Sequence, residues 1–319
     1  MLKYLIIPLS GNAVSFCHYD SHANTNDFIP VDTLKKAIFW AMKENLSVQF
    51  VYPACDVPAD ILAAIDTVDH IDIVPSDMSD AELRAQADIV VFDDWNDIDR
   101  YEFSDGKAYV VRTSLAAFID NVQTVKSVLP KLDRLNVVLT DIPGMSDVQI
   151  DSYKESLDSL IPAVAAEYLV GHPVQLNILS DRMVLDGMNN CNAGDESITL
   201  APDGNFYICP AFSNMQDNAV GNLQTGLDVR NPQLYKLTHA PICRICDAYQ
   251  CKRCVWLNKN LTREVNTPSR EQCVLAHVER NASKKLLEEL RKLAPGYLED
   301  KKIEEVGYFD PFEKIIQTQ

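Results

Sequence analysis

Residues 242–254 read ICRICDAYQCKRC, which places four cysteines within thirteen positions. They form two C-x2-C pairs, Cys243 with Cys246 and Cys251 with Cys254, separated by four residues. A C-x2-C pair brings two thiolates onto one turn, where they bind the same metal ion or cluster. Because four thiolates in one loop would repel one another, the stretch predicts a segment that folds around a bound metal or iron–sulfur cluster.

The composition predicts a globular, cytoplasmic protein. The chain has 319 residues and 47% hydrophobic content, enough for a sizeable core. No run approaches the roughly eighteen consecutive apolar residues of a membrane span. The opening MLKYLIIPLSGN also lacks the basic region and longer apolar stretch of a secretory signal. Because the cytoplasm keeps thiols reduced, dense cysteines favour metal binding over disulfides.

The charge of the chain argues against nucleic-acid binding. The formal net charge is -17, whereas binding to phosphates needs a basic surface. Fifteen acidic residues fall within residues 56–105. Two interpretations stay open for them, solvated loops around a sheet or a docking face for a basic partner or peptide.

Short apolar runs rich in β-branched residues alternate with helical patterns through the first part of the chain. Helical patterns occur at 31–46, 58–68, 115–129 and 147–169. The strand-like runs lie at 3–9, 48–53, 70–75, 87–94, 108–113, 135–142 and 174–181. Strands that are apolar on both faces and joined by helices indicate an α/β fold with a parallel sheet. We therefore expect a (β/α) partial-barrel-like N-terminal domain over residues 1–184.

From Leu185 onward the pattern changes to turns, short strands and cysteines. LAPDGNFYIC, residues 200–209, predicts a hairpin that turns at Asp203 and Gly204. A helix is expected to begin near Ser269 and to stop at Pro295. These features predict a small cysteine-rich α+β domain over residues 185–294, followed by a tail over residues 295–319.

The number of cysteines after residue 190 bears on the kind of metal. There are seven: Cys191, Cys209, Cys243, Cys246, Cys251, Cys254 and Cys273. One zinc site takes four protein ligands and would leave three thiols unused. Two iron–sulfur clusters would use four and three, the second being completed by another group, a substrate or nothing. A single metal site beside two ordinary buried thiols, Cys191 and Cys209, also stays open.

The order of these cysteines resembles the SPASM domain, the C-terminal module of radical S-adenosylmethionine enzymes that modify peptides and proteins. The match is C-x12-G-x4-C, then C-x2-C-x4-C-x2-C, then a last cysteine, and it covers about residues 185–280. The last two spacers are four and two residues, where the family usually has five and three.

The resemblance implies two clusters of the [4Fe-4S] type and a division of the cysteines between them. One set is Cys243, Cys246, Cys251 and Cys273, and the other is Cys191, Cys209 and Cys254. A three-cysteine cluster would leave one iron open to a peptide thiolate. One cluster alone, or zinc in its place, remains the alternative.

The radical half of the resemblance is incomplete. Radical S-adenosylmethionine enzymes carry C-x3-C-x2-C after the first strand, but this chain has only Cys17, with Val14 and Ser10 at the other two positions. The Gly-Gly-Glu-Pro turn that holds the cofactor is replaced by VYPACD, residues 51–56. The resemblance therefore implies no cleavage of S-adenosylmethionine, and we assign no catalytic or cofactor-binding residue.

Cys17 also precedes His18 and lies near His22, a spacing that could hold a metal. Because no fourth ligand is evident, loop residues and a buried thiol explain it better. Cys55 follows the second strand, so it could lie near Cys17 as a redox pair or as a pair of buried thiols.

The whole-chain layout resembles the CXXX-repeat peptide maturase family. That resemblance implies an accessory maturation protein for a ribosomally synthesised, post-translationally modified peptide, with the precursor peptide or a companion radical enzyme as partner. The alternative function is a zinc-binding structural or regulatory interaction protein. The sequence carries no G-x-S-x-G or H-E-x-x-H motif that would indicate another enzyme class.

Overall fold

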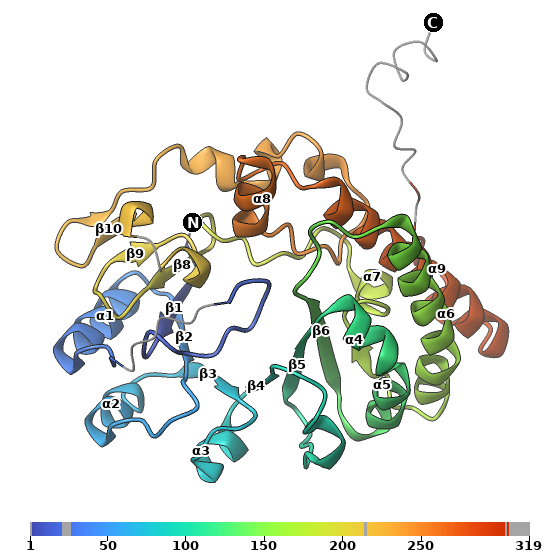
Figure 1. The fold of residues 1–319 in the computed structure, drawn as a ribbon, viewed down its shortest axis with the longest axis horizontal. Coiled ribbons are helices and arrows are strands. Elements are labelled where there is room, and N and C mark those ends of the chain that lie inside the picture. Colours follow the sequence, from blue (N-terminus) through green and yellow to red (C-terminus); the bar gives the residue numbers. More distant parts are fainter. Residues whose placement is uncertain (1, 21–26, 214–215, 304, 306–319) are drawn as a thin grey trace, which may run out of the picture.

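The computed structural model describes residues 2–20, 27–213, 216–303 and 305. His22 and most of the expected tail lie outside these residues. Seven parallel strands follow one another in the order β7-β6-β5-β4-β3-β2-β1 and form an open arc (Figure 1). Their bounds are Tyr4–Pro8 (β1), Ser47–Val51 (β2), His70–Pro75 (β3), Ile89–Phe92 (β4), Ala108–Thr113 (β5), Arg134–Leu139 (β6) and Gln175–Leu176 (β7).

Helices cover the outer face of this arc. They are α1 (Val31–Lys43), α2 (Ala59–Ile65), α3 (Ala81–Gln86), α4 (Leu115–Asp120), α5 (Val122–Val128) and α6 (Asp147–Leu169). The larger core lies between helices and strands, while a second apolar cluster, which includes Ile6, Val51 and Val110, fills part of the inner face. Apolar residues on both faces explain why the strands are continuous hydrophobic runs. The predicted α/β fold with a partial-barrel-like first part is confirmed.

Two helical details differ from expectation. The predicted helix at 115–129 is two helices, because Asn121 ends α4 and begins α5 with non-helical dihedral angles. The short α3 was not predicted. It begins at Asp80, whose carboxylate accepts hydrogen bonds from the amides of Glu82 and Leu83. A helix of six residues is too short to show a helical period in the sequence.

The cysteine-rich part joins the same sheet. Strand β8 (Ser197–Leu200) pairs in parallel with β1, and β9 (Phe206–Tyr207) runs antiparallel to β8. The predicted hairpin is therefore confirmed, and its turn needs Gly204, whose φ of +81° suits a residue without a Cβ. Two shorter strands, β10 (Gly221–Asn222) and β11 (Gly226–Leu227), form a separate ribbon.

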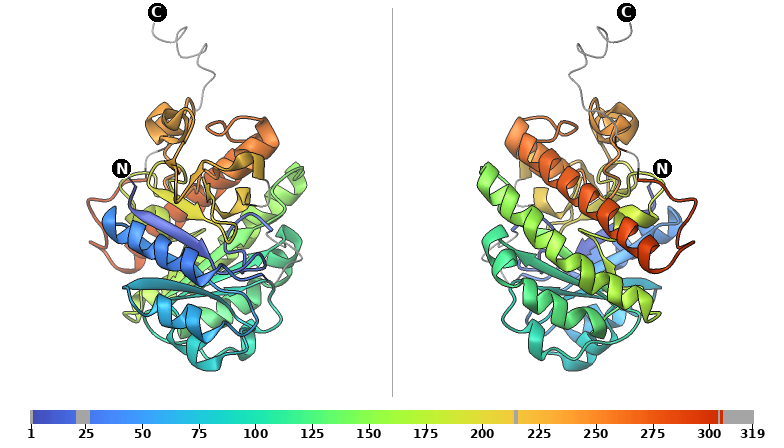
Figure 2. Two further views of the ribbon diagram at one scale, coloured as in Figure 1. Left: turned by 90° about the vertical axis from the view of Figure 1, so that its left-hand side faces the viewer. Right: turned by 90° about the vertical axis from the view of Figure 1, so that its right-hand side faces the viewer.

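Two helices complete this part. In α9 (Arg270–Leu293), Ser269 caps the N-terminus by accepting from the Gln272 amide, as the sequence predicted. In α8 (Val255–Thr262), the cap is the sulfur of Cys254. Helix α9 lies against α6, and Figure 2 shows the two side by side. The segment from β8 to α9 thus spans the open side of the arc (Figure 1). Among the helices in the described residues, none combines the length and hydropathy needed to cross a membrane.

Residues 1–184 produced alone are expected not to form a stable monomer. Strand β1 would lose its partner β8 and expose an unpaired edge. Size-exclusion chromatography and a thermal melt followed by circular dichroism would show aggregation or a non-cooperative transition, with the full chain as control. A monomer that melts cooperatively would contradict this expectation and identify residues 1–184 as an independent domain.

Candidate metal centre

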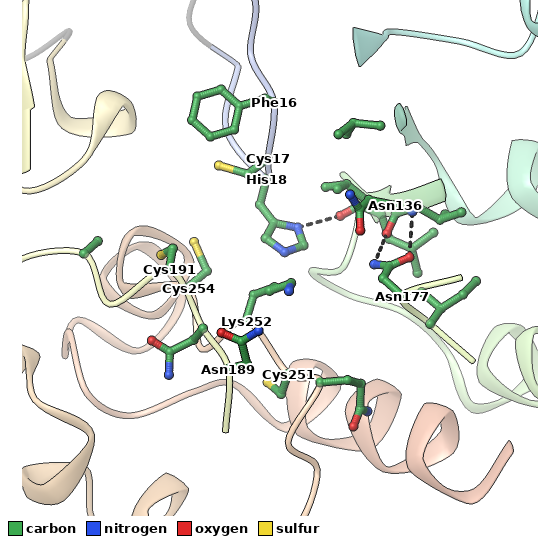
Figure 3. A pocket seen from close by; sticks show the side chains of 18 of the residues that line it. Phe16, Cys17, His18, Asn136, Asn177, Asn189, Cys191, Cys251, Lys252 and Cys254 are labelled. Carbon is green, nitrogen blue, oxygen red and sulfur yellow. Dashed lines mark hydrogen bonds between the residues drawn. The ribbon is translucent and has the colours of Figure 1, made fainter. Parts of the chain in front are cut away.

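A cavity of about 390 Å³ lies between the inner face of the arc and the cysteine-rich segment. The strands contribute Ile6, Val110 and Asn136, and the loop after β1 contributes Cys17 and His18. From the cysteine-rich side the lining includes Asn189, Asn190, Cys191, Cys209, Cys251, Lys252 and Cys254. Figure 3 shows the thiols of Cys17, Cys191, Cys251 and Cys254 around one space with the amides of Asn136 and Asn189. The cavity therefore joins the two parts of the chain.

Four of the sequence-predicted ligands line this cavity, Cys191, Cys209, Cys251 and Cys254. We call Cys191, Cys209 and Cys254 the upper thiol group. Cys191 precedes β8, Cys209 follows β9, and Cys254 caps α8. Burial raises the pKa of Cys209 well above its usual value, and the charge of Cys254 raises it further. Burial, followed by the charge of Cys191, raises the pKa of Cys254 to about 12. The three sulfur atoms are thus electrostatic neighbours.

The other four, Cys243, Cys246, Cys251 and Cys273, form the lower thiol group. Burial is the main cause that raises the pKa of Cys243 to about 11, with a smaller contribution from Cys246. Burial raises the pKa of Cys273 to about 12, with smaller contributions from the charges of Cys243 and Cys246. Burial also raises the pKa of Cys251, and the charges of Cys243 and Cys246 raise it further. Electrostatic interactions therefore connect Cys243 and Cys246 with both Cys251 and Cys273.

Backbone amides point at several of these sulfur atoms. The amide of Ala248 donates to Cys246 Sγ at 3.4 Å, and that of Leu257 donates to Cys254 Sγ at 3.5 Å. Such bonds favour the thiolate over the thiol and are common around thiolate-bound metal centres. Without a cation, however, burial raises the pKa of Cys254, Cys243 and Cys273 and keeps these three thiols protonated, so metal binding would release protons.

Arg253, which sequence reasoning did not single out, is only 1% exposed. Its Nη2 donates to the Tyr235 carbonyl at 2.5 Å. Its Nε and Nη1 have no hydrogen-bond partner among the described residues. Burial lowers its pKa, while the charges of Cys243, Cys191 and Cys251 raise it. A buried guanidinium with two unsatisfied donors is costly on its own, and an anionic cluster on either side would supply the missing charge. The buried charge of Arg253 is therefore compatible with the iron–sulfur clusters that the sequence resemblance implies.

The spacing of the sulfur atoms also bears on zinc. Zinc holds thiolates at about 2.3 Å, so its ligand atoms lie about 3.8 Å from one another. Among the described residues no three cysteine sulfurs lie within 4.8 Å of one another, and the group that meets this limit is Cys246, Asp247 and His277. A cluster needs wider spacing, because several irons separate its ligands. The thiol groups therefore suit clusters better than single ions.

The group of Cys246, Asp247 and His277 is a poor site for a cation. Cys246 Sγ lies 3.7 Å from His277 Nε2. The Asp247 carboxylate, however, accepts from Arg280 Nη1 at 2.6 Å, and the Asp247 carbonyl accepts from Arg182 at 2.6 Å. The ion pair with Arg280 already neutralises this carboxylate, which weakens the attraction for a divalent ion.

Glu279, also missed in the sequence, lies on the inward side of α9 and lines the cavity. It accepts from Tyr153 Oη at 2.9 Å and from Gln250 Nε2 at 3.3 Å. Burial raises its pKa to about 7. The signal that could have revealed it is its place in the apolar stripe of α9, at helical spacing from Gln272, Leu275 and Ala276.

The region where a radical cluster would lie holds different chemistry. Val14 is 7% exposed and packs in the inner apolar cluster with Ile6 and Val51. Ser10 is buried, and its hydroxyl donates to Asn12 Oδ1 at 2.5 Å. Positions 10, 14 and 17 correspond to the three cysteines of the radical motif, and Cys17 is the one thiol among them.

The remaining candidates from the first part of the chain are His18, His22 and Cys55. His18 lines the cavity, and its Nδ1 donates to the Leu139 carbonyl at 2.9 Å. His22 lies outside the described residues. Cys55 follows β2 and is not among the residues that line the cavity with Cys17. All nine cysteines are free of disulfide bonds.

The fold is similar to that of solved structures. The structure of anSMEcpe with bound AdoMet aligns with a TM-score of 0.63 at 12% identity, covering 93% of this chain and 97% of that one. The complex of anSMEcpe with AdoMet and the Cp18Cys peptide gives 0.61 at 13% identity, covering 92% and 99%. SuiB of Streptococcus suis with S-adenosylmethionine gives 0.49 at 14% identity, covering 85% and 77%.

A scan against protein-family models finds no match, and neither does a search of curated proteins. At the identities above, the structural likeness establishes a shared fold.

Replacing Glu279 with Gln should remove a pH dependence of stability. The metal-free protein is expected to lose stability as the pH rises from about 4.3, the unfolded value, towards the folded pKa of about 7. The reason is that the unfolded state releases the Glu279 proton at a lower pH than the folded state does. This difference lowers the free energy of unfolding by a total on the order of 3 kcal/mol. Urea unfolding at pH 5 and pH 8 measures this. Glu288→Gln, at an exposed position of the same helix, is the control, and equal slopes in both variants would contradict the prediction.

Replacing Arg253 with Met should speed loss of iron from the reconstituted protein several-fold, because the buried countercharge is removed. The metal-free protein should keep its stability, since two unsatisfied donors disappear with the charge. Iron release to a chelator, followed by absorbance, measures the effect. Arg263→Met is a matched control, because Arg263 is exposed but shares a positive φ, 68° against 44°. Identical release rates in the two folded variants would refute the role.

Proposed function

We propose that the protein is an accessory factor in the maturation of a ribosomally synthesised, post-translationally modified peptide. It would bind iron–sulfur clusters and a precursor peptide or partner radical enzyme, without cleaving S-adenosylmethionine itself. The observation that carries this proposal is the buried Arg253, which interacts electrostatically with cysteines of both thiol groups and has two donors without partners among the described residues, together with the cavity between the arc and the cysteine-rich segment.

The assignment of ligands follows the two thiol groups. Cys243, Cys246, Cys251 and Cys273 would hold one [4Fe-4S] cluster, and Cys191, Cys209 and Cys254 would bind the other. When bound, such clusters supply one-electron transfer. The chain itself supplies amide donors to the sulfurs and the buried charge of Arg253. Residues 1–184 would act as the degenerate radical-type scaffold, 185–294 as the SPASM-like domain and 295–319 as the tail, in the cytoplasm.

The absence of S-adenosylmethionine cleavage is supported by the loop after β1. Three thiolates at this position would be needed to leave one iron open to the cofactor. Here Val14 packs against aliphatic side chains, and Ser10 is buried. Valine offers no lone pair to iron, so a cluster at this position would have to form with Cys17 as its single conventional ligand.

Peptide binding is supported by the chemistry of the cavity. Its wall combines apolar strand residues with Asn136, Asn177 and Lys252, side chains that can bond a peptide backbone. Asn177 is already oriented by the Val137 backbone, which donates to its Oδ1 at 2.8 Å and accepts from its Nδ2 at 3.0 Å. The similar fold of anSMEcpe has been seen with a bound peptide.

The test combines metal content with two functional measurements on anaerobically reconstituted protein. We expect about eight irons with matching sulfide per chain, no 5′-deoxyadenosine from S-adenosylmethionine and dithionite, and binding of a fluorescent cysteine-repeat peptide by anisotropy. The metal-free protein and a scrambled, cysteine-free peptide are the controls. Turnover of S-adenosylmethionine by this chain alone, or equal binding of both peptides, would contradict the proposal.

A second candidate function is a zinc-binding structural or regulatory interaction protein. The observation that favours it is the close approach of Cys246, Asp247 and His277, although the ion pair of Asp247 with Arg280 weakens this group as a cation site. Stoichiometric zinc without iron in the same metal analysis would replace the first proposal with this one.

A further inference from the structure

We infer that Cys17, from the loop after β1, is the fourth protein ligand of the centre formed by Cys191, Cys209 and Cys254. This inference rests on the proposed cluster binding and deepens it. The sequence leaves the upper thiol group one ligand short, and the fold supplies a fourth thiol from the other end of the chain.

The position of Cys17 is the first argument. Cys17 lines the same cavity as Cys191, Cys209 and Cys254. Figure 3 shows Cys17, Cys191 and Cys254 on one side of this space, whereas Cys251 of the lower group lies apart beside Asn189. The four thiols come from four separate segments, so their convergence is a property of the tertiary fold.

Mutual electrostatics agree with this position. Burial raises the pKa of Cys17 well above its usual value, and the nearby charges of Cys254 and Cys191 raise it further. Burial is likewise the main cause that raises the pKa of Cys209, and the charges of Cys254 and Cys17 raise it further. Buried thiolates this close together would be unstable without a cation between them.

The surroundings of the Cys17 sulfur match those of the other ligands. Amides of Tyr19 and His18 donate to Cys17 and oppose the effect of burial on its pKa. In the same way the Ala211 amide acts on Cys209, and the Leu257 amide donates to Cys254. Amide donors of this kind hold a sulfur in the thiolate form that a metal requires.

The backbone of Cys17 is fixed from two strands, which would preorganise it as a ligand. Arg112 of β5 donates from Nε to the Cys17 carbonyl at 3.0 Å and from Nη2 to the Tyr19 carbonyl at 2.8 Å. The same guanidinium pairs with Asp93 at 2.6 Å. On the other side, His18 is tied to the Leu139 carbonyl of β6 at 2.9 Å. These contacts hold the loop against the cavity wall.

A second, independent group points to a ligand in the same place. Asn190, 8% exposed, lines the cavity, and its Nδ2 has no partner among the described residues. An inorganic sulfide or a thiolate of a bound cluster would accept this donor. Four thiols in each group would use eight of the nine cysteines in the chain and leave Cys55.

The assignment of Cys17 as a ligand changes the expected mode of peptide binding. With Cys17 bound, each iron of the upper centre has a protein thiolate, and binding releases the four thiol protons to solvent. A cysteine of the precursor peptide would then meet no open iron there. Peptide recognition would depend on the cavity wall instead.

The test uses the full chain as wild type, Cys17→Ala and the matched control Cys55→Ala, reconstituted together. Iron and sulfide are counted, and the electron paramagnetic resonance spectrum is recorded after brief oxidation. We expect Cys55→Ala to keep about eight irons, and Cys17→Ala to fall to between about four and seven with a [3Fe–4S] signal. Equal iron and equal spectra in the two variants would overturn the inference. Wild-type protein that binds no iron would instead overturn the proposed function.

A second measurement needs no variant, in case Cys17→Ala fails to fold. Native wild-type protein is alkylated with iodoacetamide before and after cluster removal, and each cysteine is quantified by mass spectrometry. We expect Cys17 to be protected in the loaded protein and labelled after removal, while Cys55 is labelled in both. Labelling of Cys17 that does not change on cluster removal would contradict its role as a ligand.

Discussion

The parallel pairing of β1 with β8 is the contact on which the rest of the structure depends. The amides of Lys3 and Tyr4 both donate to the Glu196 carbonyl, at 2.7 and 3.0 Å, and set the register of the two strands. This pairing fixes the hairpin whose flanks carry Cys191 and Cys209 beside the loop that carries Cys17. Without it, the hairpin would have no partner strand in the arc, and the cysteines would have no common cavity.

Within that frame, the interior is organised by a balance of buried charge. Arg253 is a buried cation that lacks acceptors for two of its donors among the described residues, and it interacts electrostatically with Cys243, Cys191 and Cys251. A buried guanidinium is unfavourable alone, because burial in a low-dielectric interior penalises an isolated charge. The anionic clusters that we propose would complement this charge.

Sequence patterns revealed much of the fold, because the strands are continuous apolar runs and Ser269 is a strong helix cap. They did not reveal α8, whose cap is a cysteine sulfur and not an oxygen. The grouping of seven cysteines came from their order along the chain. The proximity of Cys17 to these groups could not be predicted, because it depends on how the sheet brings distant segments together. Arg253 adjoins Cys254 in the sequence, but its burial could not be predicted from the local pattern. Glu279 resembled any other acid on a helix until its burial was known.

The β1–β8 pairing also bears on how the chain is made. Strand β1 leaves the ribosome early, but its partner β8 follows only after most of the parallel sheet has been synthesised. At typical elongation rates this takes on the order of ten seconds. During that time one sheet edge and the inner apolar face are unprotected, and such long-range parallel contacts form slowly. A nascent chain of this protein therefore exposes an unpaired strand edge until β8 has been synthesised, and its cysteines can share one cavity only after that point.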